Sequence, residues 1–324
     1  MYKPKIPEYF DIMEVSKDKL LFKSPERSIS LRGKSLSLVK TLLPYLKGEL
    51  ELKEISNNSE ISGKEVKEIL KLLSEKGLIS DNVNSEHSKL SKEKINFFAR
   101  KMGNEKLSQL KITLKKAKIT IIGAGEIGLN TLRSLINYNI GEITIIDKNL
   151  DKQDKEFKDF KNIKWYKKEI DENAIKDSDI VLFCSDKPDF KTHHSINELC
   201  VKNNKVWISA RFDGLTGEVG PLVVPKKTAC YNCYDKRIKS NLENIDERLV
   251  FEKHLEKNEA ANYGGLNQFY TVIAEYLSLE VIKYLTKYET PATLGAVFFL
   301  DFDKYENELC KVLKIPRCPI CSMK

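Results

Sequence analysis

The chain has 324 residues, an apolar fraction of 41% and a net charge of +8 from 55 basic and 47 acidic residues. This length favours one large α/β domain plus a smaller one, and the dispersed basic excess does not require nucleic acid. No apolar run approaches the roughly 18 residues of a transmembrane helix, and residues 1–15 lack the apolar centre of a signal peptide. We therefore expect a cytoplasmic protein whose partner is neither a membrane nor a nucleic acid.

Residues 1–85 are predicted to form a small α+β domain. Two short apolar runs can pair as a β-hairpin around Pro25, and three helical segments follow, the last of which begins with a capping box at Ser62 and Glu65. The expected elements are a hairpin at residues 20–22 and 28–31, helices at 35–46, 52–55 and 62–76, and an extended segment at 78–79. This order is typical of a winged helix-turn-helix domain.

The third predicted helix indicates how such a domain would be used. Its exposed face carries lysines and carboxylates in alternation: Lys64, Lys67 and Lys71 among Glu65, Glu68 and Glu75. A helix in the major groove gains little from carboxylates that face phosphates. Peptide capture, in which a partner segment adds a strand to the edge of the wing, needs no basic excess. The sequence favours peptide over DNA, and a plain docking or dimerisation domain remains open.

Residues 86–115 are polar and lysine-rich, with one apolar cluster at Ile95, Phe97 and Phe98. We expect a linker that becomes a helix docked on the large domain, with its lysines on a solvated face.

The large domain, residues 116–324, is organised around a predicted βαβ unit at residues 118–147. A β-branched run ends in the glycines of a G-x-G-x-x-G loop, Gly123, Gly125 and Gly128, and a second β run ends in Asp147. Such glycines allow a tight turn and close approach of a phosphate, while an acid about 20 residues on can hold a ribose. This predicts a Rossmann-like fold; whether the glycines bind a nucleotide or only shape the turn is a separate question.

The rest of the chain continues the α/β alternation. We predict strands at 161–166, 180–183 and 206–209, a helix that includes 197–202, a glycine-rich hairpin region at 214–222, an apolar helix at 266–288, and a final strand pair at 295–302 and 309–313.

Two C-x-x-C pairs lie far apart in the sequence, Cys230 with Cys233 and Cys318 with Cys321. Four thiolates in two such pairs are typical of a closed, structural zinc site, which leaves no open position for a substrate. A redox role would need one pair at a helix N-terminus and would leave the other pair unexplained. The three remaining cysteines, Cys184, Cys200 and Cys310, are expected to be buried.

The glycine loop, the acid that closes the second strand and the two C-x-x-C pairs together resemble the E1-like superfamily of ubiquitin-activating, thiamine and molybdopterin adenylating enzymes. The resemblance covers about residues 116–324. It implies a magnesium-binding acid at Asp186, and Asn197 and His193 fall where an asparagine and an arginine are expected. The loop departs from active members at Glu126, where they usually have glycine, and residues 148–155 lack the usual arginine.

A closer resemblance covers nearly the whole chain. The segments 220–233, GPLVVPKKTACYNC, and 315–322, IPRCPICS, are similar to the E1-like component of thiazole/oxazole-modified peptide synthetases, the streptolysin-associated family. That resemblance implies a winged-helix recognition element before an E1-like domain without nucleotide chemistry. It also implies partners: the leader of a ribosomal precursor peptide, an ATP-dependent YcaO-type cyclodehydratase, a flavin-dependent azoline dehydrogenase and a second copy of the chain.

The sequence therefore predicts a leader-binding scaffold subunit with structural zinc and no complete active site of its own. The expected leader contacts are the wing strand, Ser28, Ile29, Ser30 and Leu31, and the helix residues Lys67 and Lys71, which could meet an acidic leader. The alternative is an adenylating enzyme that uses ATP and magnesium on a peptide or carrier-protein C-terminus, with the glycine loop, Asp147 and a catalytic Asp186 in working roles. A DNA-binding regulator with a Rossmann-like sensor domain is a third possibility, which the carboxylates on the third helix disfavour.

Overall fold

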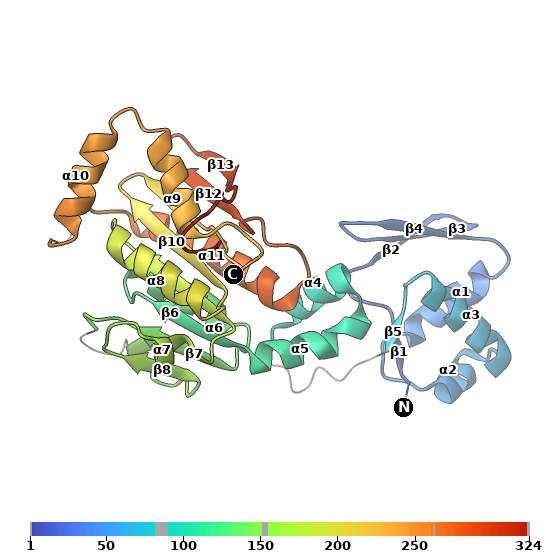
Figure 1. Ribbon diagram of the computed structural model, residues 1–324. Coiled ribbons are helices and arrows are strands. Elements are labelled where there is room, and N and C mark those ends of the chain that lie inside the picture. Colours follow the sequence, from blue (N-terminus) through green and yellow to red (C-terminus); the bar gives the residue numbers. More distant parts are fainter. Residues whose placement is uncertain (1, 82–89, 151–154, 259, 262, 323–324) are drawn as a thin grey trace. The chain divides into compact units, whose positions relative to one another are not determined.

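The computed structural model describes residues 2–81, 90–150, 155–258, 260–261 and 263–322. The chain divides into two compact units, Met1–Gln109 and Leu110–Lys324, which are described separately (Figure 1). The predicted domain boundaries at residues 85 and 115 stay predictions. None of the helices in the described ranges is long and apolar enough to cross a membrane.

The first unit contains a three-stranded antiparallel sheet in the order β2-β3-β4, and its strands are β2 (Asp11–Ser16), β3 (Lys19–Lys23) and β4 (Ser28–Arg32). Its helices are α1 (Leu36–Leu42), followed by a 3₁₀ turn at Leu43–Tyr45, α2 (Leu52–Ser59), α3 (Gly63–Glu75) and α4 (Lys92–Met102), followed by a 3₁₀ turn at Asn104–Lys106. The helix α5 (Leu107–Lys116) crosses from this unit into the second. The predicted hairpin is confirmed, and Ser62 caps α3 by accepting the Glu65 N–H at 3.3 Å.

Two features of this unit differ from the prediction. The strand β2 was not expected, because all six of its residues are exposed and it shows no buried alternation. The returning segment after α3, β5 (Ser80–Asp81), pairs with β1 (Pro4–Lys5) and not with the hairpin. One face of the sheet and the helices share a core that includes Phe22, Val39, Ile55 and Leu73.

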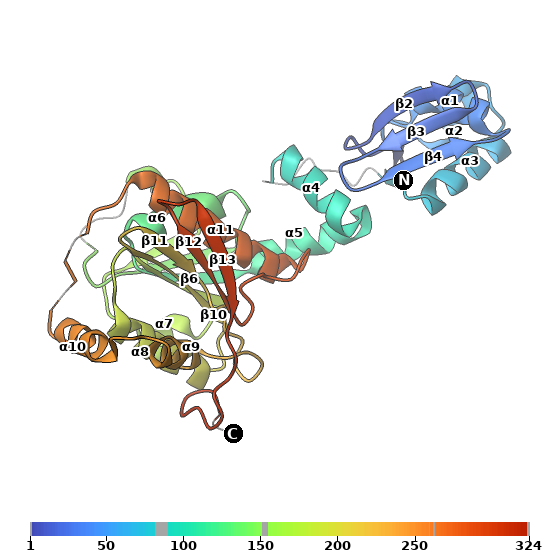
Figure 2. The same cartoon turned by 90° about the horizontal axis from the view of Figure 1, so that it is seen from above.

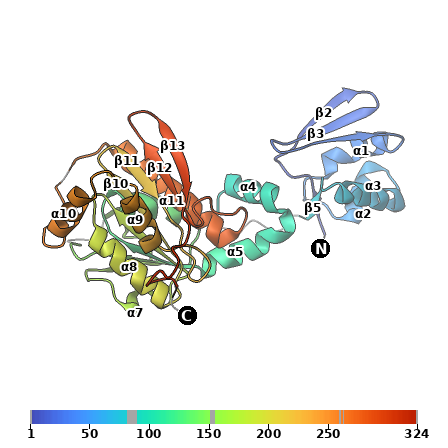
Figure 3. The same ribbon diagram turned by 45° about the horizontal axis from the view of Figure 1, so that its top comes forward.

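The second unit is built on an eight-stranded mixed sheet in the order β13-β12-β11-β10-β9-β6-β7-β8. Its strands are β6 (Lys118–Ile122), β7 (Glu142–Ile146), β8 (Ile163–Tyr166), β9 (Ile180–Ser185), β10 (Trp207–Asp213), β11 (Thr216–Val219), β12 (Ala296–Asp301) and β13 (Glu306–Lys311). The strands from β10 to β8 in this order are parallel. Beyond β10 the strands β11, β12 and β13, which are labelled in Figure 3, extend the sheet antiparallel. The predicted α/β class is confirmed, and the arrangement is consistent with a Rossmann-like domain.

Helices cover both faces of this sheet, as Figure 2 shows. The helices α6 (Glu126–Ile136) and α11 (Asn267–Thr286) pack together on one face, and α8 (Phe190–Lys202), α9 (Tyr231–Ser240), α10 (Ile245–Leu255) and the short α7 (Glu172–Ile175) lie on the other. The sequence did not indicate α9 or α10. The helix α10 buries none of its residues, which explains why it has no apolar stripe to detect.

Candidate functional site

The glycine loop joins β6 to α6 as predicted. Gly123 has a φ of +101°, and a side chain there would collide with the backbone carbonyl of Cys184. A Cβ at Gly128 would collide with the carbonyl of Gly123, and one at Gly125 with the carboxylate of Asp186. The glycines therefore allow close packing within the loop and against the end of β9, whether or not a nucleotide binds.

Asp147 and Asp186, predicted as ribose and magnesium ligands, both bond to this loop. Asp147 accepts the Ala124 N–H at 2.7 Å with one oxygen and the Asn149 N–H at 2.7 Å with the other. Asp186 accepts the Glu126 N–H at 2.6 Å and the Ile127 N–H at 2.9 Å. The N–H groups at the start of α6, which would bind a phosphate, are thus already bonded to a carboxylate.

The charge at the loop is also unfavourable for an anion. Burial raises the pKa of Asp186, its two N–H bonds lower it, and the nearby charges of Glu126 and Asp147 raise it, so that the net shift is upward. Glu126 is exposed at the first position of α6. The carboxylates of Glu126, Asp147 and Asp186 therefore surround the place where phosphates would lie. Of the segment 148–155, which lacks the usual arginine, residues 151–154 fall outside the described residues.

His193 and Asn197, which fall where the adenylating enzymes have an arginine and an asparagine, instead contact Tyr231 of α9. The ring of His193 stacks on Tyr231 at 4.1 Å with an interplanar angle of 6°, and the amide oxygen of Asn197 accepts the Tyr231 N–H at 3.0 Å. Burial, and then the charge of Arg211, hold the pKa of His193 well below its ordinary value, so this imidazole is neutral. Both residues support the helix that carries the first C-x-x-C pair.

The four cysteines predicted as metal ligands converge. Sulfur–sulfur distances are 3.9 Å for Cys230 and Cys233, 3.8 Å for Cys230 and Cys318, and 3.6 Å for Cys233 and Cys321. Tetrahedral zinc with bonds of about 2.3 Å requires sulfurs about 3.8 Å apart. The four Sγ atoms lie within 4.8 Å of one another, so the donor set fits a zinc ion.

Zinc bound there would be held by four thiolates and would have no position for a substrate, so it would clip the segment around Cys318 to α9. Cys230 is the N-cap of α9, and the Ile315 N–H donates to the sulfur of Cys233 at 3.4 Å. Cys184 and Cys200 are buried as predicted, while Cys310 is only half-buried on β13.

A buried ion pair near the cysteine cluster was not predicted from the sequence. Arg211 of β10 and Glu218 of β11 face each other across the sheet, with a guanidinium-to-carboxylate hydrogen bond between them. The Tyr234 hydroxyl donates to the second oxygen of Glu218 at 2.9 Å. In the described part of the chain, Nε and Nη1 of Arg211 have no hydrogen-bond partner. No local pattern marks this pair, because it depends on the register of two strands.

The predicted peptide-binding residues lie on two elements of the first unit. Ser28, Ile29, Ser30 and Leu31 are in β4, which is an edge strand, and Lys67 and Lys71 are exposed on α3. The Arg27 side chain donates to the carbonyl of Gly77 at 2.9 Å and so ties the turn before β4 to the chain just after α3.

The backbone of β4 presents hydrogen-bonding groups at its open edge. The Ser24 N–H donates to the carbonyl of Arg27 at 2.8 Å and closes the hairpin turn. Bonded and non-bonded pairs alternate in an antiparallel ladder, so Ile29 and Leu31 bond to β3. The N–H and C=O groups of Ser28 and Ser30 therefore point away from β3, toward the open edge.

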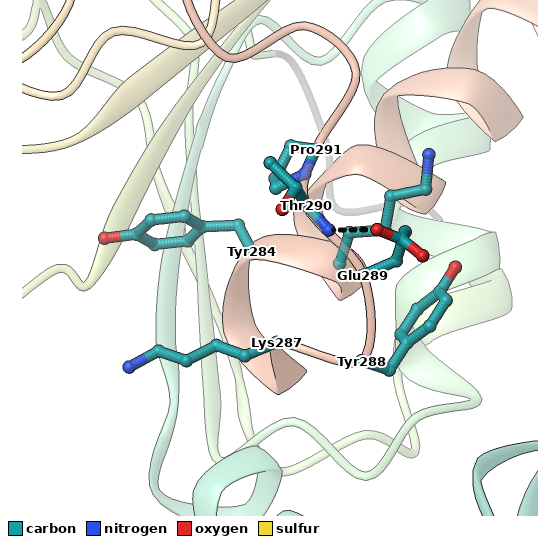
Figure 4. Close-up of a pocket in the computed structure, with 7 residues that line it drawn as sticks. Tyr284, Lys287, Tyr288, Glu289, Thr290 and Pro291 are labelled. Carbon is teal, nitrogen blue, oxygen red and sulfur yellow. Dashed lines mark hydrogen bonds between the residues drawn. The ribbon is translucent and has the colours of Figure 1, made fainter. Parts of the chain in front are cut away.

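A hollow of about 370 Å³ lies at the end of α11 (Figure 4). In the figure, Tyr284 and Lys287 extend away from Tyr288 on the opposite side of the helix end. The polar side chains diverge, so we assign no chemistry to this hollow.

Comparison with known proteins agrees with this architecture. The model of the ThiF family matches residues 155–322, which is just over half of the chain and includes all four clustered cysteines. The chain belongs to the ThiF family. The match begins after the glycine loop, so the shared pattern of this ThiF-family chain lies in the second half of the fold.

Curated relatives of this ThiF-family chain match only a part of it. An adenylyltransferase and sulfurtransferase UBA4 of Candida glabrata is 29% identical over 152 residues, covering 38% of this chain and 35% of UBA4. The sulfur carrier protein ThiS adenylyltransferase of Escherichia coli K12 is 26% identical over 149 residues, covering 46% of this chain and 52% of the relative. The chain thus spans about a third to a half of these relatives.

Solved structures share the fold of the whole ThiF-family chain. The heterocyclase TruD superposes with a TM-score of 0.71 at 17% identity, covering 99% of this chain and 43% of TruD. A heterocyclase in complex with substrate and cofactor has a TM-score of 0.72 at 15% identity, covering 98% of this chain and 39% of that one. E. coli MccB with ATP has a TM-score of 0.67 at 20% identity and covers 98% and 99% of the two chains.

Proposed function

We propose that this protein is the leader-binding scaffold subunit of an azoline-forming ribosomal-peptide synthetase. The first unit, of winged-helix type, would hold the leader of a precursor peptide, and a separate YcaO-type enzyme would use ATP to cyclise core cysteine, serine and threonine residues. Holding the leader makes the encounter of core peptide and enzyme effectively intramolecular, which raises its frequency without a new active site. The work would take place in the cytoplasm, in a homodimer, with zinc as a structural element and a flavin-dependent dehydrogenase as a further partner.

The observation that carries this proposal is the open edge of β4. An extended peptide can add a strand where N–H and C=O groups are unpaired, and Ser28 and Ser30 present both. The lysines of α3 would add attraction for an acidic leader. The chain shares its fold with 43% of the heterocyclase TruD, and this likeness is the reason for placing the proposal among azoline-forming synthetases.

We expect Ser30→Pro to weaken peptide binding about tenfold or more, because it removes an N–H that faces the incoming strand and adds bulk there. Proline is tolerated at this position because the β3–β4 ladder does not use that N–H. The probe is a fluorescent peptide selected from a displayed random library on the full-length protein, and its affinity is measured by anisotropy.

The matched control is Ile12→Pro on β2, whose N–H also points away from β3 by the same alternation. Its affinity should stay within twofold of the unaltered protein. Equal losses in both proline variants, or unchanged binding in Ser30→Pro, would remove β4 as the docking edge.

Charge reversal at Lys67 and Lys71 together should weaken the binding of an acidic peptide several-fold, and this loss should depend strongly on salt.

An adenylating enzyme is the second candidate, because MccB with ATP matches this chain over nearly the full length of both. The contacts of Asp186 favour the scaffold, since its carboxylate bonds to the N–H groups that a phosphate would need. ATP and magnesium would be held by the glycine loop, Asp147 and Asp186 only if Asp186 left these N–H groups.

We expect the purified protein to show neither ATP–pyrophosphate exchange nor calorimetric binding of magnesium-ATP, with or without the selected peptide. Asp186→Ala should leave these results unchanged, or allow weak ATP binding by exposing the start of α6. Exchange by the unaltered protein that Asp186→Ala abolishes would establish the adenylating enzyme and reject the scaffold.

A further inference from the structure

The side chain of Asn232 lies between the two C-x-x-C pairs. It belongs to the first pair, within Cys-Tyr-Asn-Cys, and its Nδ2 reaches the sulfur of Cys318 in the second pair at 3.3 Å. Asn232 is half-buried, whereas Cys318 is buried. The contact therefore joins two segments that are 86 residues apart in the sequence, and it is partly buried.

The negative charge of a zinc–thiolate centre explains why the Asn232 hydrogen bond would be stabilising. Four thiolates around one Zn²⁺ carry a formal charge of 2−, and buried negative charge is stabilised by N–H donors directed at the sulfurs. Backbone donors supply part of this: the Ile315 N–H reaches Cys233, and N–H groups of the second pair lie against Cys318. Asn232 supplies a donor from a side chain, and it does so from the opposite pair.

The amide of Asn232 acts as a hydrogen-bond donor toward the metal centre. Asn232 is the second residue of α9, so its side chain lies in the first turn of the helix. From there its Nδ2 donates to the sulfur of Cys318 in the other pair. A donor aimed at a buried thiolate is the arrangement by which groups around a metal orient and tune its ligands.

We infer that Asn232 is a positioning residue of the metal centre, which holds the Cys318 thiolate in place and withdraws negative charge from it. This inference rests on the metal site described above and on the structural role proposed for its zinc. Asn232 does not itself bind the metal. It fastens the second pair to the first, so that the four sulfurs are closer to their bound arrangement before the ion enters.

The test is the zinc affinity of Asn232→Ala and Asn232→Asp in the full-length protein, measured by competition with a chromogenic chelator. We expect Asn232→Ala to weaken zinc about 10- to 100-fold. Asn232→Asp should weaken it more, because a carboxylate of the same shape repels the thiolate. Asn241→Ala is the matched control: this asparagine, at the other end of α9, donates to the Arg237 carbonyl at 2.8 Å, and its loss should leave zinc affinity unchanged.

Cobalt substitution gives a second measurement that a purely structural role would not alter. Loss of a hydrogen bond raises the energy of the sulfur electrons, so the sulfur-to-cobalt absorption of Asn232→Ala should shift to longer wavelength. Zinc affinity within twofold of the unaltered protein in both variants, with an unshifted cobalt spectrum, would overturn the inference. An unaltered protein that binds no zinc would instead reject the metal site itself.

Discussion

Replacing Cys318 by serine is expected to abolish stoichiometric zinc and to unfold much of residues 110–324. Structural zinc sites contribute about 10–16 kcal/mol in small peptides, whereas whole domains are stable by only about 5–15 kcal/mol. The zinc would join α9 to the segment after β13, so its loss frees both from the sheet. The measurement is zinc content together with thermal unfolding followed by circular dichroism.

The control for this experiment is Cys310→Ser, since Cys310 is a half-buried cysteine outside the cluster. It should keep one zinc per chain and shift the melting temperature only slightly. Chelator treatment of the unaltered protein should reproduce the Cys318→Ser result, and added zinc should reverse it. A chelated protein that melts like the zinc-loaded one would show that the four cysteines do not support the fold.

Glu218→Leu is expected to destabilise the protein by about 3–5 kcal/mol, because it leaves the guanidinium of Arg211 buried without its counter-charge. Arg211 and Glu218 are 7% and 8% exposed, and Glu218 is the carboxylate on which this guanidinium depends among the described residues. The free energy of unfolding is obtained from urea titration with zinc present.

The double variant Arg211→Leu with Glu218→Leu separates two contributions to the loss of stability, the unpaired buried charge and the altered packing. A buried ion pair replaced by apolar residues of similar volume is often neutral, so the double variant should recover most of the stability lost in Glu218→Leu. Tyr234 would lose its acceptor in both variants, so its contribution cancels in the comparison. A double variant less stable than Glu218→Leu alone would show that packing dominates at this position.

The parts of the fold that follow from local pattern were predictable. The βαβ unit has a continuous apolar strand, three glycines and a closing acid in a short stretch, and the structure confirms β6, α6 and β7. Convergence of the cysteines was predictable because C-x-x-C pairs have few other uses. Their distance in sequence does not weaken that argument, because ligand chemistry alone requires them to meet.

The parts that depend on tertiary register were not predictable. Arg211 and Glu218 meet because two strands pair in one register, and a slip of one residue would place them on opposite faces. The positions of His193 and Asn197 depend on the packing of α8 against α9, which the sequence did not indicate as a helix. The interpretation of Asp186 likewise needed the structure, because only its hydrogen bonds place it on the loop.

The small sheet of the first unit protects its two edges unequally. The outer strand β2 has a β-bulge between Glu14 and Ser16, and bulges and charges are devices that keep edge strands from recruiting other chains. The pairing of β3 with β4 has no such irregularity. A regular edge is a template for any extended segment, so an unoccupied β4 exposes the protein to self-association. Occupancy of β4 would thus also determine how soluble the protein is at high concentration.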